Sequence, residues 1–199
     1  MSGCATVLQM YYERNLPHWH PEGKAIFLTW RLYGSLPEHI VLQIRGDKER
    51  RGRQFARADR FLDKGAFGPL WLRNPEISSA VESCILRGAR ELGQYTLVTY
   101  VIMPNHVHLL IEPHLPLRRI TAGIKGTSAY QANRILGHVR QRFWQGESFD
   151  HWVRTSAEGE KICRYIEYNP VRAGLAASPD LWPWSGAAKG STGTLACAV

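Results

Sequence analysis

The sequence predicts an α+β fold in which helices pack on one antiparallel sheet. Two strand-like runs follow each other closely at residues 95–103 and 106–112, and another run stands near the start, at residues 25–32. Segments whose apolar residues recur at helical spacing lie between and after these runs. An α+β sandwich is the most economical architecture for this order of elements.

The first third of the chain predicts one strand and one charged helical stretch. Residues 25–32 are rich in aromatic and β-branched residues, which favours a strand. Before them, the histidines of Pro17-His18-Trp19-His20-Pro21 stand between prolines, so we expect a surface loop there. After a Gly-Ser-Pro break, residues 38–64 predict a helical stretch. Its middle, residues 46–53, is so charged that we interpret it as a solvated turn or frayed helix.

The central part of the chain predicts helix, hairpin, helix. The Asn-Pro pair at 74–75 suits the N-cap and first residue of a helix. Residues 95–103 and 106–112 then predict two antiparallel strands joined by the tight connection at 104–105. Residues 117–136 predict an amphipathic helix that ends before a glycine.

The last elements are an extended segment and a helix. Residues 141–153 carry four large aromatic side chains, which indicates a strand or a paired extended segment. A helix follows from Ser156 and must stop near Asn169, because Pro170 disfavours helical geometry in the residue before it.

No repeat or linker divides the chain. We therefore expect one domain over residues 1–186, with a basic helical insertion around 40–64 and a disordered Gly/Ser/Ala-rich tail at 187–199. No apolar run approaches the roughly 20 residues that a membrane span needs. Four scattered cysteines and the absence of a signal-peptide pattern predict free thiols and a cytoplasmic location.

The charge balance is compatible with a polyanionic partner. The chain has 25 Lys and Arg against 17 acids, a formal charge of +8 and a pI near 9.6. Nucleic acid would explain it, since phosphate neutralisation supplies most non-specific affinity, but a basic protein without such a partner is about equally compatible. One basic region covers residues 45–60. The other supplies the candidate DNA contacts, with one tryptophan for base stacking or for the core: Arg118, Arg119, Lys125, Arg134, Arg142, Trp144, Arg154, Arg164 and Arg172.

Two histidines at strand spacing form a candidate metal site. His106 and His108 project from the same face of a strand, while Val107 points to the other. Neutral imidazole is the commonest protein metal ligand, so the pair can share one ion. The alternative is an ordinary pair of half-buried or solvent-facing histidines.

A tyrosine and an asparagine in the last helix share one face. Tyr165 and Asn169 lie four residues apart. A tyrosine hydroxyl, with a pKa near 10, is a poor nucleophile unless a cation polarises the group it attacks. Asn169 can supply an amide oxygen as a third ligand. The alternative is that Tyr165 packs by its ring and Asn169 caps the helix.

Together these motifs resemble the single-tyrosine (Y1) transposases of the IS200 type, whose His-hydrophobic-His motif is matched by residues 101–110. Four further blocks are similar to the REP-associated tyrosine transposases, so the resemblance covers roughly residues 17–186. The blocks are residues 17–23, 143–151, 165–175 and 182–185. The resemblance implies a ferredoxin-like antiparallel sheet with helices packed mainly on one face.

The resemblance also implies a mechanism. His106, His108 and Asn169 would hold Mg²⁺ or Mn²⁺, and Tyr165 would attack single-stranded DNA at hairpin-bearing ends. A 5′-phosphotyrosine link and a free 3′-hydroxyl would result, and the covalent link would allow rejoining. Such a protein would act as a monomer or homodimer near the bacterial nucleoid, without a membrane partner.

Some features depart from the pattern or leave alternatives. Gly146 stands where relatives often carry a basic residue, and Tyr168 is a second, less favourably placed tyrosine. A hydrolase with a His-x-His-x-His motif is disfavoured by Leu110, whereas a zinc hydrolase would need Glu112 as its base. A domesticated protein that binds DNA hairpins without cleaving them is the remaining alternative.

Overall fold

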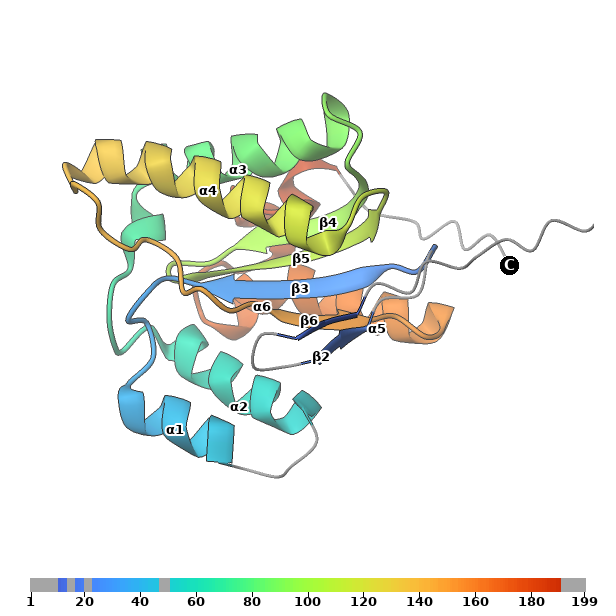
Figure 1. Ribbon diagram of the computed structural model, residues 1–199, viewed down its shortest axis with the longest axis horizontal. Helices are drawn as coiled ribbons and strands as arrows, with labels where there is room; N and C mark the ends of the chain where they lie inside the picture. Colours follow the sequence, from blue (N-terminus) through green and yellow to red (C-terminus); the bar gives the residue numbers. More distant parts are fainter. Residues whose placement is uncertain (1–10, 14–16, 20–22, 47–50, 191–199) are drawn as a thin grey trace, which may run out of the picture.

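A four-stranded antiparallel sheet forms the centre of the computed structural model, which describes residues 11–13, 17–19, 23–46 and 51–190 (Figure 1). The strand order is β4-β5-β3-β6. The strands are β3 (Ile26–Arg31), β4 (Tyr95–Ile102), β5 (His106–Pro113) and β6 (Phe149–Trp152). The predicted α+β class is confirmed.

Two short strands form a separate antiparallel pair. They are β1 (Tyr11–Glu13) and β2 (Pro17–Trp19). The prediction of a loop is therefore wrong for Pro17–Trp19, whose backbone pairs with β1. The other histidine of that predicted loop, His20, lies outside the described residues.

Helices lie on both sides of the central sheet (Figure 1). The two long helices α3 (Pro75–Arg90) and α4 (Leu117–Leu136) pack on one face, as in the predicted arrangement. The other face is covered by α5 (Ser156–Glu167) and by one aromatic side chain of α2 (Arg51–Lys64), which follows α1 (Glu38–Gly46). This second face holds the candidate functional site.

The alternation of side chains along β3 and β5 separates the two faces. Val107, Leu109 and Ile111 point into the apolar cluster beneath α3 and α4. His106 and His108 therefore point to the opposite face, where Leu110 and Phe27 belong to the second cluster. A shift of one residue in this register would turn both histidines away from the site.

Residues that predicted helix ends in the sequence lie at or near helix ends in the structure. The Asn74 Oδ1 atom accepts a hydrogen bond from the Glu76 N–H, and α4 closes at Gly137 with a φ of 67°. Helix α5 ends at Glu167, two residues before the predicted end. A short helix α6 (Asn169–Arg172) follows, with Pro170 in its first turn, where a missing N–H costs nothing.

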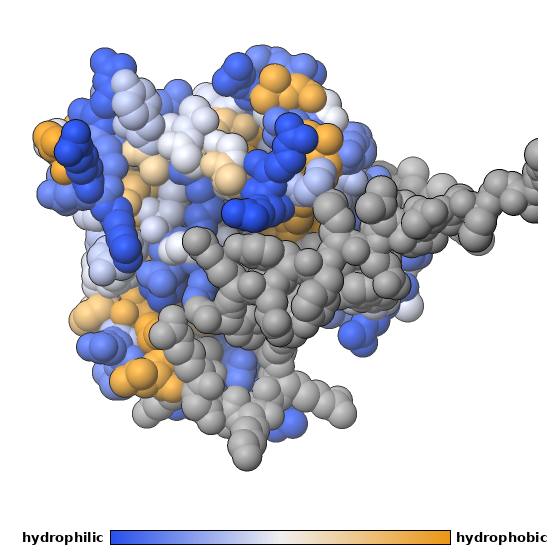
Figure 2. Space-filling view, in the orientation of Figure 1, coloured by the Kyte–Doolittle hydropathy of each residue, from blue (hydrophilic) through white to orange (hydrophobic). Residues whose placement is uncertain are grey.

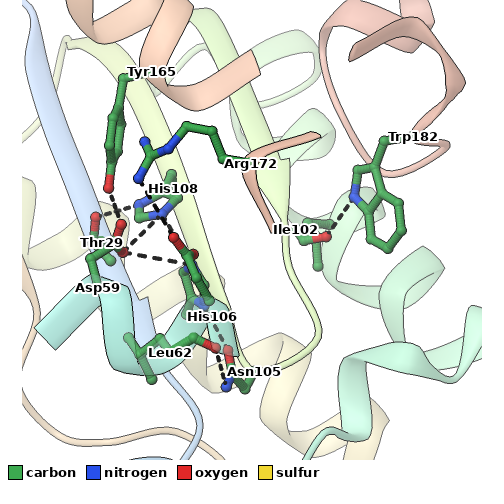
Figure 3. Close-up of polar contacts among 11 residues, drawn as sticks. Thr29, Asp59, Leu62, Ile102, Asn105, His106, His108, Tyr165, Arg172 and Trp182 are labelled. Atoms are coloured by element: carbon green, nitrogen blue, oxygen red, sulfur yellow. Dashed lines mark hydrogen bonds and ion pairs between the residues drawn. The ribbon is translucent and has the colours of Figure 1, made fainter. Parts of the chain in front are cut away.

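The C-terminal segment pairs with the edge of β4. The Ile102 N–H donates to Trp184 O (2.8 Å), and the Trp182 indole donates to Ile102 O (3.0 Å; Figure 3). The 3-10 helices η1 (Trp71–Arg73), η2 (Pro179–Leu181) and η3 (Ala187–Lys189) complete the fold. Ordered structure thus continues past the expected boundary at residue 186, while 191–199 lie outside the described residues.

The visible surface is mainly hydrophilic. In Figure 2 apolar side chains form separate small patches on that face rather than one continuous area. None of the helices in the described part of the chain is both long and apolar enough to span a bilayer.

Candidate metal centre and nucleophile

The two predicted histidines meet at the centre of the site (Figure 3). His106 and His108 are fully buried on β5, and their Nε2 atoms are 3.0 Å apart. Burial, followed by the neighbouring His108, lowers the pKa of His106 to about 3. His106 is therefore neutral near pH 7, the state in which an imidazole nitrogen binds a metal ion.

Two neighbouring side chains orient the imidazole rings. Asn105 donates from Nδ2 to Leu62 O (3.0 Å), which leaves its Oδ1 to accept from Nδ1 of His106 (2.6 Å). The Nε2 atom of His106 then carries the free lone pair and faces the site. Thr29 places its hydroxyl 2.7 Å from Nδ1 of His108, so we assign the same orientation to that ring.

Asp59, a residue of α2, lies beside the two histidines of β5. Its Oδ1 lies 3.2 Å from His108 Nε2 and 3.7 Å from His106 Nε2, and the three side chains can offer metal ligands within 4.8 Å of one another. Burial alone would raise the pKa of Asp59, but His108 above all, with His106 and Arg172, holds it below the ordinary value. A buried carboxylate thus faces two imidazole nitrogens.

Tyr165 contacts this carboxylate directly. Its hydroxyl donates to Asp59 Oδ2, so one carboxylate links the tyrosine to the histidine pair (Figure 3). The Arg172 guanidinium lies over the tyrosine ring, with its Cζ atom 4.7 Å from the ring centre. The alternative tyrosine, Tyr168, has a side chain that is 49% exposed.

A second carboxylate from α2 lies beside the cluster. Asp63 Oδ1 is 3.8 Å from His106 Nε2, and its Oδ2 is 3.6 Å from Arg172 Nη2. Burial, and then the charge of Asp59, raises the pKa of Asp63 to about 6. Within the described part of the chain, Oδ1 of each aspartate is buried without a hydrogen-bond partner. Such orphaned oxygens facing imidazole nitrogens are the donor set that a divalent cation would satisfy.

Asn169 is fully buried at the start of α6. Neither its Oδ1 nor its Nδ2 makes a hydrogen bond with any described residue. A buried amide without partners is costly, so the side chain remains a candidate for contact with a group from outside the chain. Its assignment as a metal ligand stays a prediction.

The predicted DNA contacts divide into surface and internal residues. Lys125 donates to Gln145 O (2.7 Å), Gly146 O (3.0 Å) and Ser148 Oγ (3.2 Å), so it holds a loop. Trp144 is buried and donates from its indole to Ser128 Oγ (3.0 Å), as a core residue does. We therefore retain neither as a direct DNA contact. The others are exposed: Arg118, Arg119, Arg134, Arg142, Arg154, Arg164 and Arg172.

The two aspartates of α2 were not predicted as site residues. The sequence places Asp59 within a run of arginines, and 106 residues separate it from Tyr165. A possible signal was the spacing of Asp59 and Asp63, which puts two acids on one face of an otherwise basic helix.

Comparison with known proteins finds a family match in the central part of the chain. Residues 72–169 match the family model described as "Transposase IS200 like". The match confirms the predicted relationship to the IS200-like transposases for the segment that contains His106, His108, Tyr165 and Asn169. Helix α2 lies outside it. Comparison with curated proteins finds no match.

Among solved structures, a REP-associated tyrosine transposase bound to a REP hairpin is similar in fold. The two chains are 17% identical, the match covers 90% of this chain and 84% of that chain, and the TM-score is 0.53. A candidate transposase from Deinococcus radiodurans R1 is 16% identical over 85% of this chain and 97% of its own, with a TM-score of 0.37. Only the first match bears on the fold.

Proposed function

We propose that the protein is a metal-dependent transposase that cleaves and rejoins single-stranded DNA at hairpin-bearing ends through a 5′-phosphotyrosine intermediate. The observation that carries this proposal is the convergence of His106, His108, Asp59 and the Tyr165 hydroxyl in one buried cluster. The family match supports DNA as the substrate, and the hairpin-bound relative supports a hairpin partner.

We assign Mg²⁺ or Mn²⁺ to the cluster, held by Nε2 of His106 and His108. Asp59 Oδ1 fits the third position, because it is buried, lacks a hydrogen-bond partner and lies 3.2 Å from one of these nitrogens. Asn169, whose amide oxygen is also unpaired, is the alternative third ligand. When bound, the ion acts as a Lewis acid on the attacked phosphate.

The chain's own residues prepare the nucleophile. Asp59 holds the Tyr165 hydroxyl at the edge of the histidine pair, and Arg172 offers a cation beside the tyrosine ring for the phosphate charge. In the proposed step, the tyrosine oxygen bonds to phosphorus and the 3′-oxygen leaves. The tyrosine loses one proton and the 3′-oxygen gains one. The reverse step on another 3′-end rejoins DNA without ATP.

A covalent-adduct assay tests the function. Wild type, Tyr165→Phe and Tyr168→Phe are incubated with a single-stranded oligonucleotide carrying a hairpin and its flank, in Mg²⁺ or Mn²⁺. We expect a denaturant-stable protein–DNA adduct in wild type and Tyr168→Phe, and none in Tyr165→Phe. Adduct formation by Tyr165→Phe would exclude the assigned nucleophile. Hairpin binding without any adduct would instead favour a protein that only binds DNA.

The third ligand is tested by calorimetric Mn²⁺ titration of Asp59→Asn and Asn169→Ala. Asp59→Asn removes a charged ligand with little change of shape, and we expect at least a tenfold loss of affinity. The opposite ranking of the two variants would establish Asn169 as the ligand.

A further inference from the structure

The outer face of α2 carries a basic stripe. Arg53, Arg57, Arg60 and Lys64 are exposed and follow each other at intervals of four, three and four residues, which places them along one side of the helix. A row of this kind, about 16 Å long at 1.5 Å per residue, can follow the phosphates of one nucleic-acid strand.

The inner face of the same helix closes the site. Phe55 stacks on Phe149 of β6 with ring centres 4.3 Å apart and meets Tyr165 edge-on at 6.3 Å. Asp59, one turn further along, holds the Tyr165 hydroxyl. His106 and His108 have no exposed surface and Asp59 only 1%, so a phosphate reaches them only if a covering element moves.

Helices α1 and α2, with the glycines Gly34 and Gly68 at either end, form a unit that the chain enters and leaves at neighbouring points. We call this pair of points the neck. A Cβ atom at Gly68 would lie 2.3 Å from Gly34 O, so the chain leaves the unit directly beside the point where it enters. Both glycines have positive φ, +74° each. The unit also has its own small apolar cluster, formed by Leu36, Ile40 and Leu62 with two neighbours. A movement of the unit about the neck would therefore leave that cluster intact.

We propose that α2 covers the site and that DNA binds to the outer face of this helix. The basic stripe binds backbone phosphates of the strand to be cleaved, and this binding draws Phe55 away from Tyr165 so that the scissile phosphate enters, while Asp59, one turn nearer the neck, stays beside the histidine pair. The inference rests on the proposed function. It adds a DNA-contacting surface outside the family-matched segment and assigns that surface a role in opening the site.

The test compares two triple variants with the same loss of charge. One is Arg53→Gln/Arg57→Gln/Arg60→Gln on α2. The control is Arg73→Gln/Arg87→Gln/Arg90→Gln, whose exposed arginines lie outside α2, in η1 and α3. Thermal unfolding first establishes that both variants fold. Fluorescence anisotropy with a hairpin oligonucleotide, at several salt concentrations, then gives affinity and its salt dependence. Single-turnover adduct formation at saturating DNA gives the rate.

We expect the α2 variant to bind about tenfold more weakly, with a salt slope smaller by roughly 2, since each single-strand phosphate contact contributes about 0.7. Its adduct rate at saturating DNA should fall several-fold, while the control stays near wild type. Equal losses in both variants, or an unchanged α2 variant, would refute the DNA-contacting role. Lost affinity with an unchanged rate would refute the opening role. Failure of wild type to bind any strand would refute the proposed function as well.

Discussion

Thr29→Val tests whether the histidine pair is held ready for a metal ion. Thr29 lies directly opposite His108 in the β3–β5 register, and its Oγ1 is 2.7 Å from Nδ1. Both side chains are buried, with exposed fractions of 6% and 0%. Valine keeps the shape and β-branching of threonine but cannot accept a hydrogen bond, so the substitution removes this contact alone.

The expected effects follow from that burial. A buried imidazole N–H left without an acceptor costs about 1–3 kcal/mol of unfolding free energy, which urea denaturation measures. Loss of an orienting partner lowers metal affinity by about 10- to 100-fold, equivalent to roughly 1.4–2.7 kcal/mol, which calorimetric Mn²⁺ titration measures.

The matched control is Thr96→Val on β4. Its Oγ1 lies 3.1 Å from His114 Nε2, but that contact is exposed. Water replaces an exposed contact, so we expect a change within about 0.5 kcal/mol and unaltered Mn²⁺ affinity. If Thr29→Val binds Mn²⁺ within twofold of wild type, the Thr29 hydroxyl does not orient a metal ligand.

Two further substitutions test the surroundings of the site. Burial raises the pKa of Asp63 to about 6 from 3.8, so wild type loses up to about 3 kcal/mol of stability as the pH rises from about 4 to a little above 6. Asp63→Asn removes that loss. In the absence of metal, the unfolding free energy of the variant minus that of wild type should increase by about 1 kcal/mol between pH 5 and 8. A constant difference would show that Asp63 titrates normally. Lys125→Met should lower the unfolding free energy by about 2 kcal/mol, because the ammonium donates to two carbonyl oxygens and a hydroxyl, yet leave DNA affinity unchanged. Weaker DNA binding by a fully stable Lys125→Met protein would return this lysine to the DNA contacts.

Features set by local sequence were predictable. The alternation of side chains in a strand placed His106 and His108 on one face, and Asn74, Gly137 and Pro170 marked helix ends. These features depend on neighbours within a few residues, where backbone geometry dictates direction. The sequence therefore predicted the histidine pair before any tertiary contact was known.

Features set by the docking of distant elements were not predictable. Asp59 meets Tyr165 because α2 packs on the second face of the sheet through Phe55, whereas the sequence predicted only a basic helical insertion there. Trp144 likewise lies beside basic residues in the sequence, but the Leu32–Trp144 bridge turns it into the core. A helix's charge predicts its exposed face but not what its opposite face contacts.

The origin of the site residues limits what the family match implies. The matched segment supplies the histidine pair and the tyrosine, whereas the carboxylate between them comes from α2, outside that segment. Asp59 contacts both groups, so a change in the position of α2 alters the surroundings of the histidine pair and of the Tyr165 hydroxyl together. On the proposed function, the matched residues supply the histidines and the nucleophile, and α2 supplies the carboxylate that contacts both.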